Sequence, residues 1–168
     1  MNNNSWQNEV KSTLTIVGPP SLYLPTNGPS IFLAGSIDGG NAIEWQKEAI
    51  HYIEKSWIDD DITIYNPRRE IEYDSKWDAE QHAWGISFLE ACDYILMHLS
   101  TKVGVSPISL LELGLYCKNQ KLYLSIDEEY PKKFDVEVHY NFFAKKQIYK
   151  DIYSSIEAIK KDWKNKNV

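Results

Sequence analysis

The chain has 168 residues, of which 43% are hydrophobic and 25% are charged, a composition typical of one folded domain and not of a disordered or fibrous chain. Its formal net charge of −6 argues against binding along a phosphate backbone, so we expect no nucleic-acid partner. No apolar run is long enough to span a bilayer, and the polar start lacks the pattern of a signal peptide. We therefore expect a cytoplasmic protein without a membrane partner.

The N-terminal part of the chain is interpreted as an arm and a loop. Residues 17–30 contain four prolines and two glycines, which disfavour a regular element. We place the N-terminal arm and loop at residues 1–30 and a single domain at residues 31–168.

From residue 30 onward, short apolar runs alternate with segments of helical periodicity. The predicted strands are SIFLAGS, ITIYNP, DYILMHLS and KLYLSID, and the predicted helices lie at about 42–57, 79–91, 107–120 and 148–163. This alternation predicts an α/β protein with a parallel sheet that is covered by helices on both faces. Ligands of such sheets bind at the carboxyl ends of the strands.

Three polar segments follow predicted strands and are expected to meet at one cleft. AGSIDGG either cradles a phosphate or sugar through backbone N–H groups or is only a tight turn that requires glycine. In NPRRE, Arg68 and Arg69 either grip an anion or form a solvated or ion-paired couple. The third segment is the loop before SPISLLELG, where Ser106 and Pro107 are a plausible N-cap and first helical turn.

Glu112 is the one carboxylate in the apolar stretch SPISLLELGLY. An acid among apolar side chains is costly unless it is paired or used. The alternative is that Glu112 lies with Ser109 and Tyr116 on a narrow polar stripe that faces solvent, and periodicity alone does not separate the two. The histidines and cysteines show no metal-like spacing, so we expect neither a metal nor another cofactor.

The segments SIFLAGSIDGG, YNPRRE, QHAWGISFLEACDYILM and SPISLLELGLY, in this order, resemble the nucleoside 2-deoxyribosyltransferase-like family over residues 17–125. The resemblance implies a flavodoxin-like or Rossmann-like α/β fold and an enzyme that cleaves the N-glycosidic bond of a nucleoside or nucleotide. By the same resemblance Glu112, in the ELG motif, is the nucleophile that attacks the anomeric carbon and forms a covalent glycosyl intermediate. A second base or water then takes the sugar, which gives a transferase or a hydrolase.

The resemblance also assigns the residues that line the pocket. Ser36 and its neighbours in AGSIDGG match the loop that holds the sugar and, in nucleotide hydrolases, the 5′-phosphate. Ser106 matches a phosphate-binding serine. The further pocket candidates are Asp38, Gly39, Asn66, Arg69 and Trp84. Because relatives assemble with their pockets near subunit interfaces, we also expect a homo-oligomer.

Gly85 departs from the family pattern, in which an acid that can protonate the leaving base follows the tryptophan. Three explanations stay open. Another acid substitutes, the candidates being Asp74, Asp78, Glu80 and Asp93. Alternatively, the leaving group needs no proton, as in an NAD-type glycohydrolase that releases cationic nicotinamide, or the protein is a nucleotide-binding module with weakened catalysis.

Overall fold

The computed structural model describes residues 13–24, 27–37, 43–58, 60–68, 75–100 and 105–166, with residues 75–78 described by their backbone only. Within these residues five parallel strands form one sheet in the order β1-β3-β2-β4-β5. The strands are β1 (Leu14–Val17), β2 (Ser30–Gly35), β3 (Ile62–Tyr65), β4 (Tyr94–Leu99) and β5 (Leu122–Ile126). The helices are α1 (Trp45–Ser56), α2 (Ser75–Ala91), α3 (Pro107–Tyr116), α4 (Lys133–Phe143) and α5 (Ile152–Lys166).

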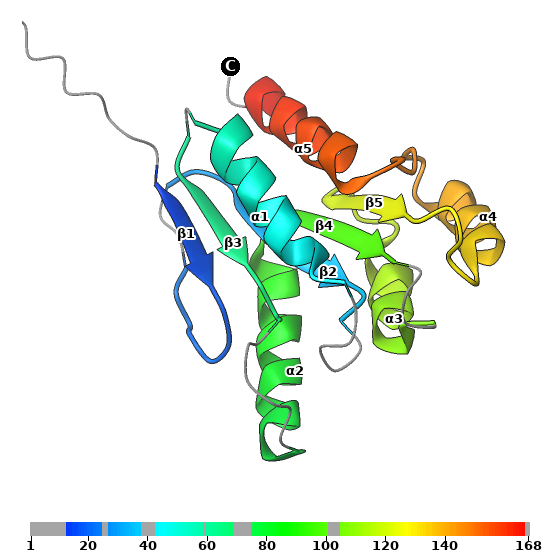
Figure 1. Ribbon diagram of the computed structural model, residues 1–168, viewed down its shortest axis with the longest axis horizontal. Helices are drawn as coiled ribbons and strands as arrows, with labels where there is room; N and C mark the ends of the chain where they lie inside the picture. Colours follow the sequence, from blue (N-terminus) through cyan, green and yellow to red (C-terminus); the bar gives the residue numbers. More distant parts are fainter. Residues whose placement is uncertain are drawn as a thin grey trace, which may run out of the picture.

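Helices cover both faces of the sheet (Figure 1). On one face, side chains of α1 and α5 pack against strand residues such as Ile31 and Leu33. On the other face, side chains of α2, α3 and α4 pack against the alternate strand residues, such as Phe32 and Ala34. Because both sides of β2 to β5 are buried, these strands read as continuous apolar runs in the sequence. The structure thus confirms the α/β class with a flavodoxin-like or Rossmann-like sheet.

The four strands and four helices expected from residue 30 onward are present, and two further elements were not predicted. Strand β1 lies in the segment interpreted as an arm and loop, and it pairs in parallel with β3 at the edge of the sheet. It has only four residues and a proline-rich turn follows it, which masked the strand pattern. Helix α4 buries only Val136 and Tyr140, too few for a clear helical period. The prediction that residues 1–30 hold only an arm and a loop was wrong, because β1 lies within them. The domain boundary at residue 31 stays a prediction.

The order of strands reverses between β2 and β4, because the chain leaves β2 to form β3 on one side and then returns to form β4 on the other. The carboxyl ends of the two central strands at such a switch point are where open α/β sheets bind ligands. Ser36 follows β2, and Ser100 follows β4. Among the described helices, none is both long and apolar enough to cross a membrane.

Gly35, the last residue of β2, is required by the sheet itself. Its φ is 135°, and a Cβ placed on it would lie 2.0 Å from the carbonyl oxygen of His98 on β4. The same close approach lets the backbone N–H of Ser36 donate to that oxygen at 3.1 Å. The first glycine of the AGSIDGG motif therefore allows the close approach of β2 to β4 at the point where Ser36 follows β2.

Replacing Gly35 by alanine should destabilise the fold by at least ~2 kcal/mol, because the added methyl group clashes with main chain and the positive φ is strained. Urea unfolding followed by circular dichroism measures the change. Gly114→Ala is the matched control, because a Cβ at this helical position meets no described heavy atom within 4 Å. That control should be neutral or stabilising by up to ~1 kcal/mol, and an equal loss in both variants would contradict the assigned role of Gly35.

Candidate active site

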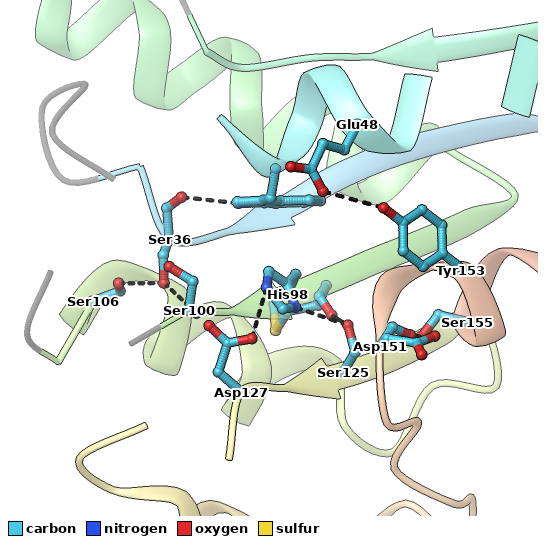
Figure 2. A network of polar contacts seen from close by, with 12 residues as sticks. Ser36, Glu48, His98, Ser100, Ser106, Ser125, Asp127, Asp151, Tyr153 and Ser155 are labelled. Carbon is cyan, nitrogen blue, oxygen red and sulfur yellow. Dashed lines mark hydrogen bonds and ion pairs between the residues drawn. The ribbon is translucent and has the colours of Figure 1, made fainter. Parts of the chain in front are cut away.

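Three serine hydroxyl groups gather at the carboxyl edge of the sheet, at the switch point (Figure 2). The Ser36 hydroxyl accepts hydrogen bonds from the Ser106 hydroxyl at 2.9 Å and from the backbone N–H of Ser100 at 3.1 Å. The Ser100 hydroxyl is buried and has no hydrogen-bond partner among the described residues. A buried hydroxyl of this kind is poised to bond a ligand that enters the site.

Ser106 occupies the N-cap position of α3, as expected, but its hydroxyl makes no capping hydrogen bond. It turns instead toward Ser36. The N-terminus of α3 therefore lies beside the serine cluster, defined as Ser36, Ser100 and Ser106. Free N–H groups and the positive end of the helix dipole favour an anion at such a place.

Helix α3 is oriented with its polar side toward the protein. Ser109 and Tyr116 are buried, and Glu112, which lies between them on the same side, is half-buried. The apolar residues Ile108, Leu111 and Leu115 are 51%, 61% and 68% exposed. The polar stripe weighed in the sequence does exist, but it faces inward, so Glu112 is not a solvated surface acid.

The environment of Glu112 disfavours the charged carboxylate. Burial raises the pKa of Glu112 to about 7, and the imidazole of His82 on α2 acts in the opposite direction and lowers the pKa. A carboxyl group whose pKa lies near neutrality has a property expected of a catalytic acid or nucleophile. His82 is a site residue that sequence reasoning missed, because no spacing rule connects residues of two separate helices.

Gly85 lies on α2, three residues after His82, and so on the same side of the helix. A Cβ added there would meet no heavy atom of the described residues within 4 Å. The position therefore has room for the first carbon of a side chain.

Two of the four candidate substitutes for that acid can be placed. Asp93 accepts hydrogen bonds from the backbone N–H of Ser30 at 2.9 Å and from the Ser30 hydroxyl at 2.7 Å. It precedes β4, so it lies at the amino ends of the strands, opposite to the serine cluster, and its candidacy was wrong. Glu80 is exposed on α2. Asp74 and the side chain of Asp78 lie outside the described residues.

The remaining predicted pocket residues have different positions. Asn66 follows β3 at the carboxyl edge, where its side-chain oxygen accepts a hydrogen bond from the Arg68 backbone N–H at 3.1 Å. Trp84 is 4% exposed and packs against Phe32 and Phe88 in the core, so the structure shows packing for it and its substrate contact stays a prediction. Asp38, Gly39 and Arg69 lie outside the described residues.

Arg68 is tied to the start of α1. Its guanidinium donates to the carbonyl oxygen of Ile43 at 3.1 Å and to the side-chain oxygen of Gln46 at 3.3 Å. Of the two arginines in NPRRE, Arg68 therefore links the loop after β3 to the start of α1.

The buried side chain of His98 lies beside the serine cluster (Figure 2). His98 Nδ1 lies 3.0 Å from the Ser125 hydroxyl, and its Nε2 lies 3.4 Å from a carboxylate oxygen of Asp127. Burial lowers the pKa of His98, while Asp127 favours its protonated form. Because the His98 carbonyl receives the Ser36 N–H, this network helps to fix the serine cluster.

The described residues contain no group of three or more histidine, cysteine, aspartate or glutamate side chains arranged to hold a metal ion. A shallow hollow lined by Leu14, Ile53, Trp57 and Ile62 lies at the amino-terminal edge of the sheet, away from the serine cluster.

The described residues form a doubly wound α/β protein with a serine cluster at its topological switch point. The model of the family described as nucleoside 2-deoxyribosyltransferase like matches residues 28–130, more than half of the chain, and the protein belongs to this family. Its members act in nucleoside-related glycosyl transfer. No curated protein gives a significant match.

The raised pKa of Glu112 predicts a dependence of stability on pH. The folded chain keeps a proton that the unfolded chain releases above the ordinary value of 4.5, so this contribution to stability is complete below 4.5 and is lost as the pH rises through about 7. Glu112→Gln should therefore be more stable than the wild type at pH 8, by about 1 to 3 kcal/mol. At pH 4 the two should be nearly equal.

Chemical unfolding of both proteins at several pH values measures this difference. Glu129→Gln, which removes an exposed carboxylate, is the matched control and should show no such dependence. A Glu112→Gln variant that gains no stability at pH 8 would show that the wild-type carboxylate is well solvated.

Proposed function

We propose that the protein cleaves the N-glycosidic bond of a nucleoside or nucleoside 5′-monophosphate, with Glu112 as the nucleophile. The observation that carries this proposal is the half-buried carboxyl group of Glu112, whose pKa burial raises to about 7, on the helix that begins at the serine cluster. A half-buried acid with no partner among the described hydrogen bonds is costly to maintain, and a catalytic use accounts for that cost.

The proposed reaction has two steps. A carboxylate oxygen of Glu112 attacks C1′ of the sugar as the bond from C1′ to the base breaks, and the carboxylate stabilises the positive charge that develops on the ring. A glycosyl ester of Glu112 results. Attack on C1′ by a second base gives transfer, and attack by water gives hydrolysis.

The serine cluster supports a substrate with a negatively charged 5′ group. Glu112 is six residues after Ser106 on α3, about 9 Å along the helix axis. Helical side chains lean toward the N-terminus of their helix, so Glu112 reaches back toward the cluster. The separation suits a sugar whose C1′ faces Glu112 while its 5′-phosphate receives hydrogen bonds from Ser36, Ser100 and Ser106.

Replacing Glu112 by glutamine should lower base release by at least ~10³, because the amide cannot form the covalent intermediate. Chromatography of free bases after incubation with deoxynucleosides, ribonucleosides, their 5′-monophosphates and NAD measures the loss. In the wild type the rate should fall as the pH is lowered through about 7, because only the ionised carboxyl group attacks and the pKa of Glu112 is about 7. Equal rates in wild type and variant would refute the proposal.

The same panel tests a second candidate function that Gly85 favours. An NAD-type glycohydrolase releases nicotinamide, which leaves the sugar without a proton and needs no acid at position 85. Release of nicotinamide from NAD, without release of any base from the deoxynucleosides and ribonucleosides, would identify this function in place of the first.

We further propose that the protein forms a homo-oligomer in which a second copy covers α3. The support is the exposed apolar side of that helix, with Ile108, Leu111 and Leu115 each more than half exposed. In a two-fold symmetric dimer this side meets its own copy, which would remove apolar surface from water and shield Glu112 further.

Leu115→Lys should shift the protein toward the monomer in analytical ultracentrifugation, because a lysine in an apolar symmetric contact meets a second lysine. Leu22→Lys, at a leucine that is 77% exposed in the loop after β1, is the matched control and should leave the distribution unchanged. A wild type that is monomeric at all concentrations would contradict the proposed oligomer.

A further inference from the structure

A neutral base needs a proton as it leaves the sugar, and Gly85 cannot supply one. Asp93 is excluded by its position at the opposite edge of the sheet. Among the side chains that the structure describes, the titratable one on the same side of α2 as Gly85 is that of His82, one turn earlier, and it is exposed. A group at position 82 and an acid at position 85 would project into the same region.

Helices α2 and α3 cover the same face of the sheet and run in the same direction, since each leads from the end of one parallel strand to the start of the next (Figure 1). One hydrogen bond fixes their register, in which the Tyr116 hydroxyl donates to a carboxylate oxygen of Glu90 at 2.6 Å. Glu112 is one turn before Tyr116, and His82 is two turns before Glu90. Measured along the helix axes from this bond, Glu112 lies about 6 Å and His82 about 12 Å nearer the starts of their helices.

The two groups also interact electrostatically. The imidazole of His82 is the group that lowers the pKa of Glu112 against the larger effect of burial. A protonated imidazole beside this carboxyl group favours the ionised form that attacks C1′. General acid catalysis of bond cleavage requires an acid and a nucleophile that both reach the same substrate.

We propose that His82 is the proton donor to the leaving base and takes the role that the family pattern gives to an acid at position 85. This inference rests on the proposed function of Glu112. Histidine suits the role because the N–H of an imidazolium can be given up as a proton. A proton donor at this position also implies the substrate class, which is a nucleoside or nucleotide whose neutral base must be protonated as it leaves.

The proposed step conserves charge and atoms. The N–H bond of the protonated His82 breaks, and its proton goes to a ring nitrogen of the base, which receives the electron pair of the bond to C1′. A lone pair of Glu112 forms the new bond to C1′. The products are the glycosyl ester, the neutral base and a neutral imidazole, which takes a proton from the attacking water in the second step and is thereby restored.

The test compares two leaving groups in the same enzyme. The substrate pair is a purine nucleoside or nucleotide that the wild type cleaves, and its N7-methylated counterpart, whose cationic base leaves without a proton. His82→Gln should lower release of the unmethylated purine by ~10² to 10⁴, and release of the methylated purine by less than roughly tenfold. His51→Gln, at an exposed histidine of α1 on the other face of the sheet, is the matched control and should change neither rate.

The outcomes separate this inference from the function on which it rests. Equal losses on both substrates would show that His82 only supports the fold or the position of Glu112, and no loss on either would show that it takes no part; each overturns the inference. Glu112→Gln must lose both activities. A wild type that releases no base, or a Glu112→Gln variant that matches it, refutes the proposed function and the inference with it.

A second variant gives a check that a folding defect cannot imitate. Gly85→Glu places a carboxyl group in the open space on the same side of α2. In the His82→Gln background it should restore release of the unmethylated purine at least tenfold, whereas Gly85→Ala should not. Failure of the carboxyl group to restore activity, in a protein whose thermal unfolding matches the wild type, would count against a proton-donor role for this side of α2.

Discussion

The incomplete hydration of one carboxyl group is the constraint on which the candidate site depends. Helix α3 turns Ser109, Leu113 and Tyr116 toward the protein, holds Glu112 half-buried and leaves three leucine and isoleucine side chains in solvent. The desolvated acid and the exposed apolar surface each cost free energy. Both costs are explained if Glu112 is a nucleophile and the apolar side chains near it form an assembly surface.

The sheet supplies the second requirement, a rigid place for the sugar and its 5′ group. Gly35 allows β2 to lie close to the His98 carbonyl of β4, and the hydrogen bond from the Ser36 N–H to that carbonyl positions the backbone of Ser36. The indole N–H of Trp45 donates to the Ser36 carbonyl at 3.0 Å, so the residue is also held from α1. The hydroxyl cluster is thus anchored by buried main chain, which favours a site whose geometry is set before the substrate binds.

Much of the fold could be predicted because strands buried on both faces leave an unambiguous apolar run, as in β2 and β4. Strand β1 could not, since four residues at the sheet edge carry little pattern. The sequence isolated Glu112 but could not tell which way it faces, because helical periodicity identifies a polar side without saying what covers it.

The residues around Glu112 were harder to predict for the same reason. Asp93 stood close in the sequence to the expected acid, yet it caps the opposite end of the strands. His82 has no motif of its own, and its relation to Glu112 follows only from how α2 and α3 lie together. Trp84 carries a family motif, and the structure shows its ring within the core.

The open space at Gly85 has an evolutionary consequence. Glycine codons differ from those of aspartate or glutamate by a single nucleotide, and no packed atom among the described residues opposes a side chain at this position. The chain is therefore one mutational step from the acid of its relatives, without a repacking barrier to cross. If His82 carries the proton, a mutation at position 85 would arise in a protein that already works, so both donors could coexist and selection could exchange one for the other without an inactive intermediate.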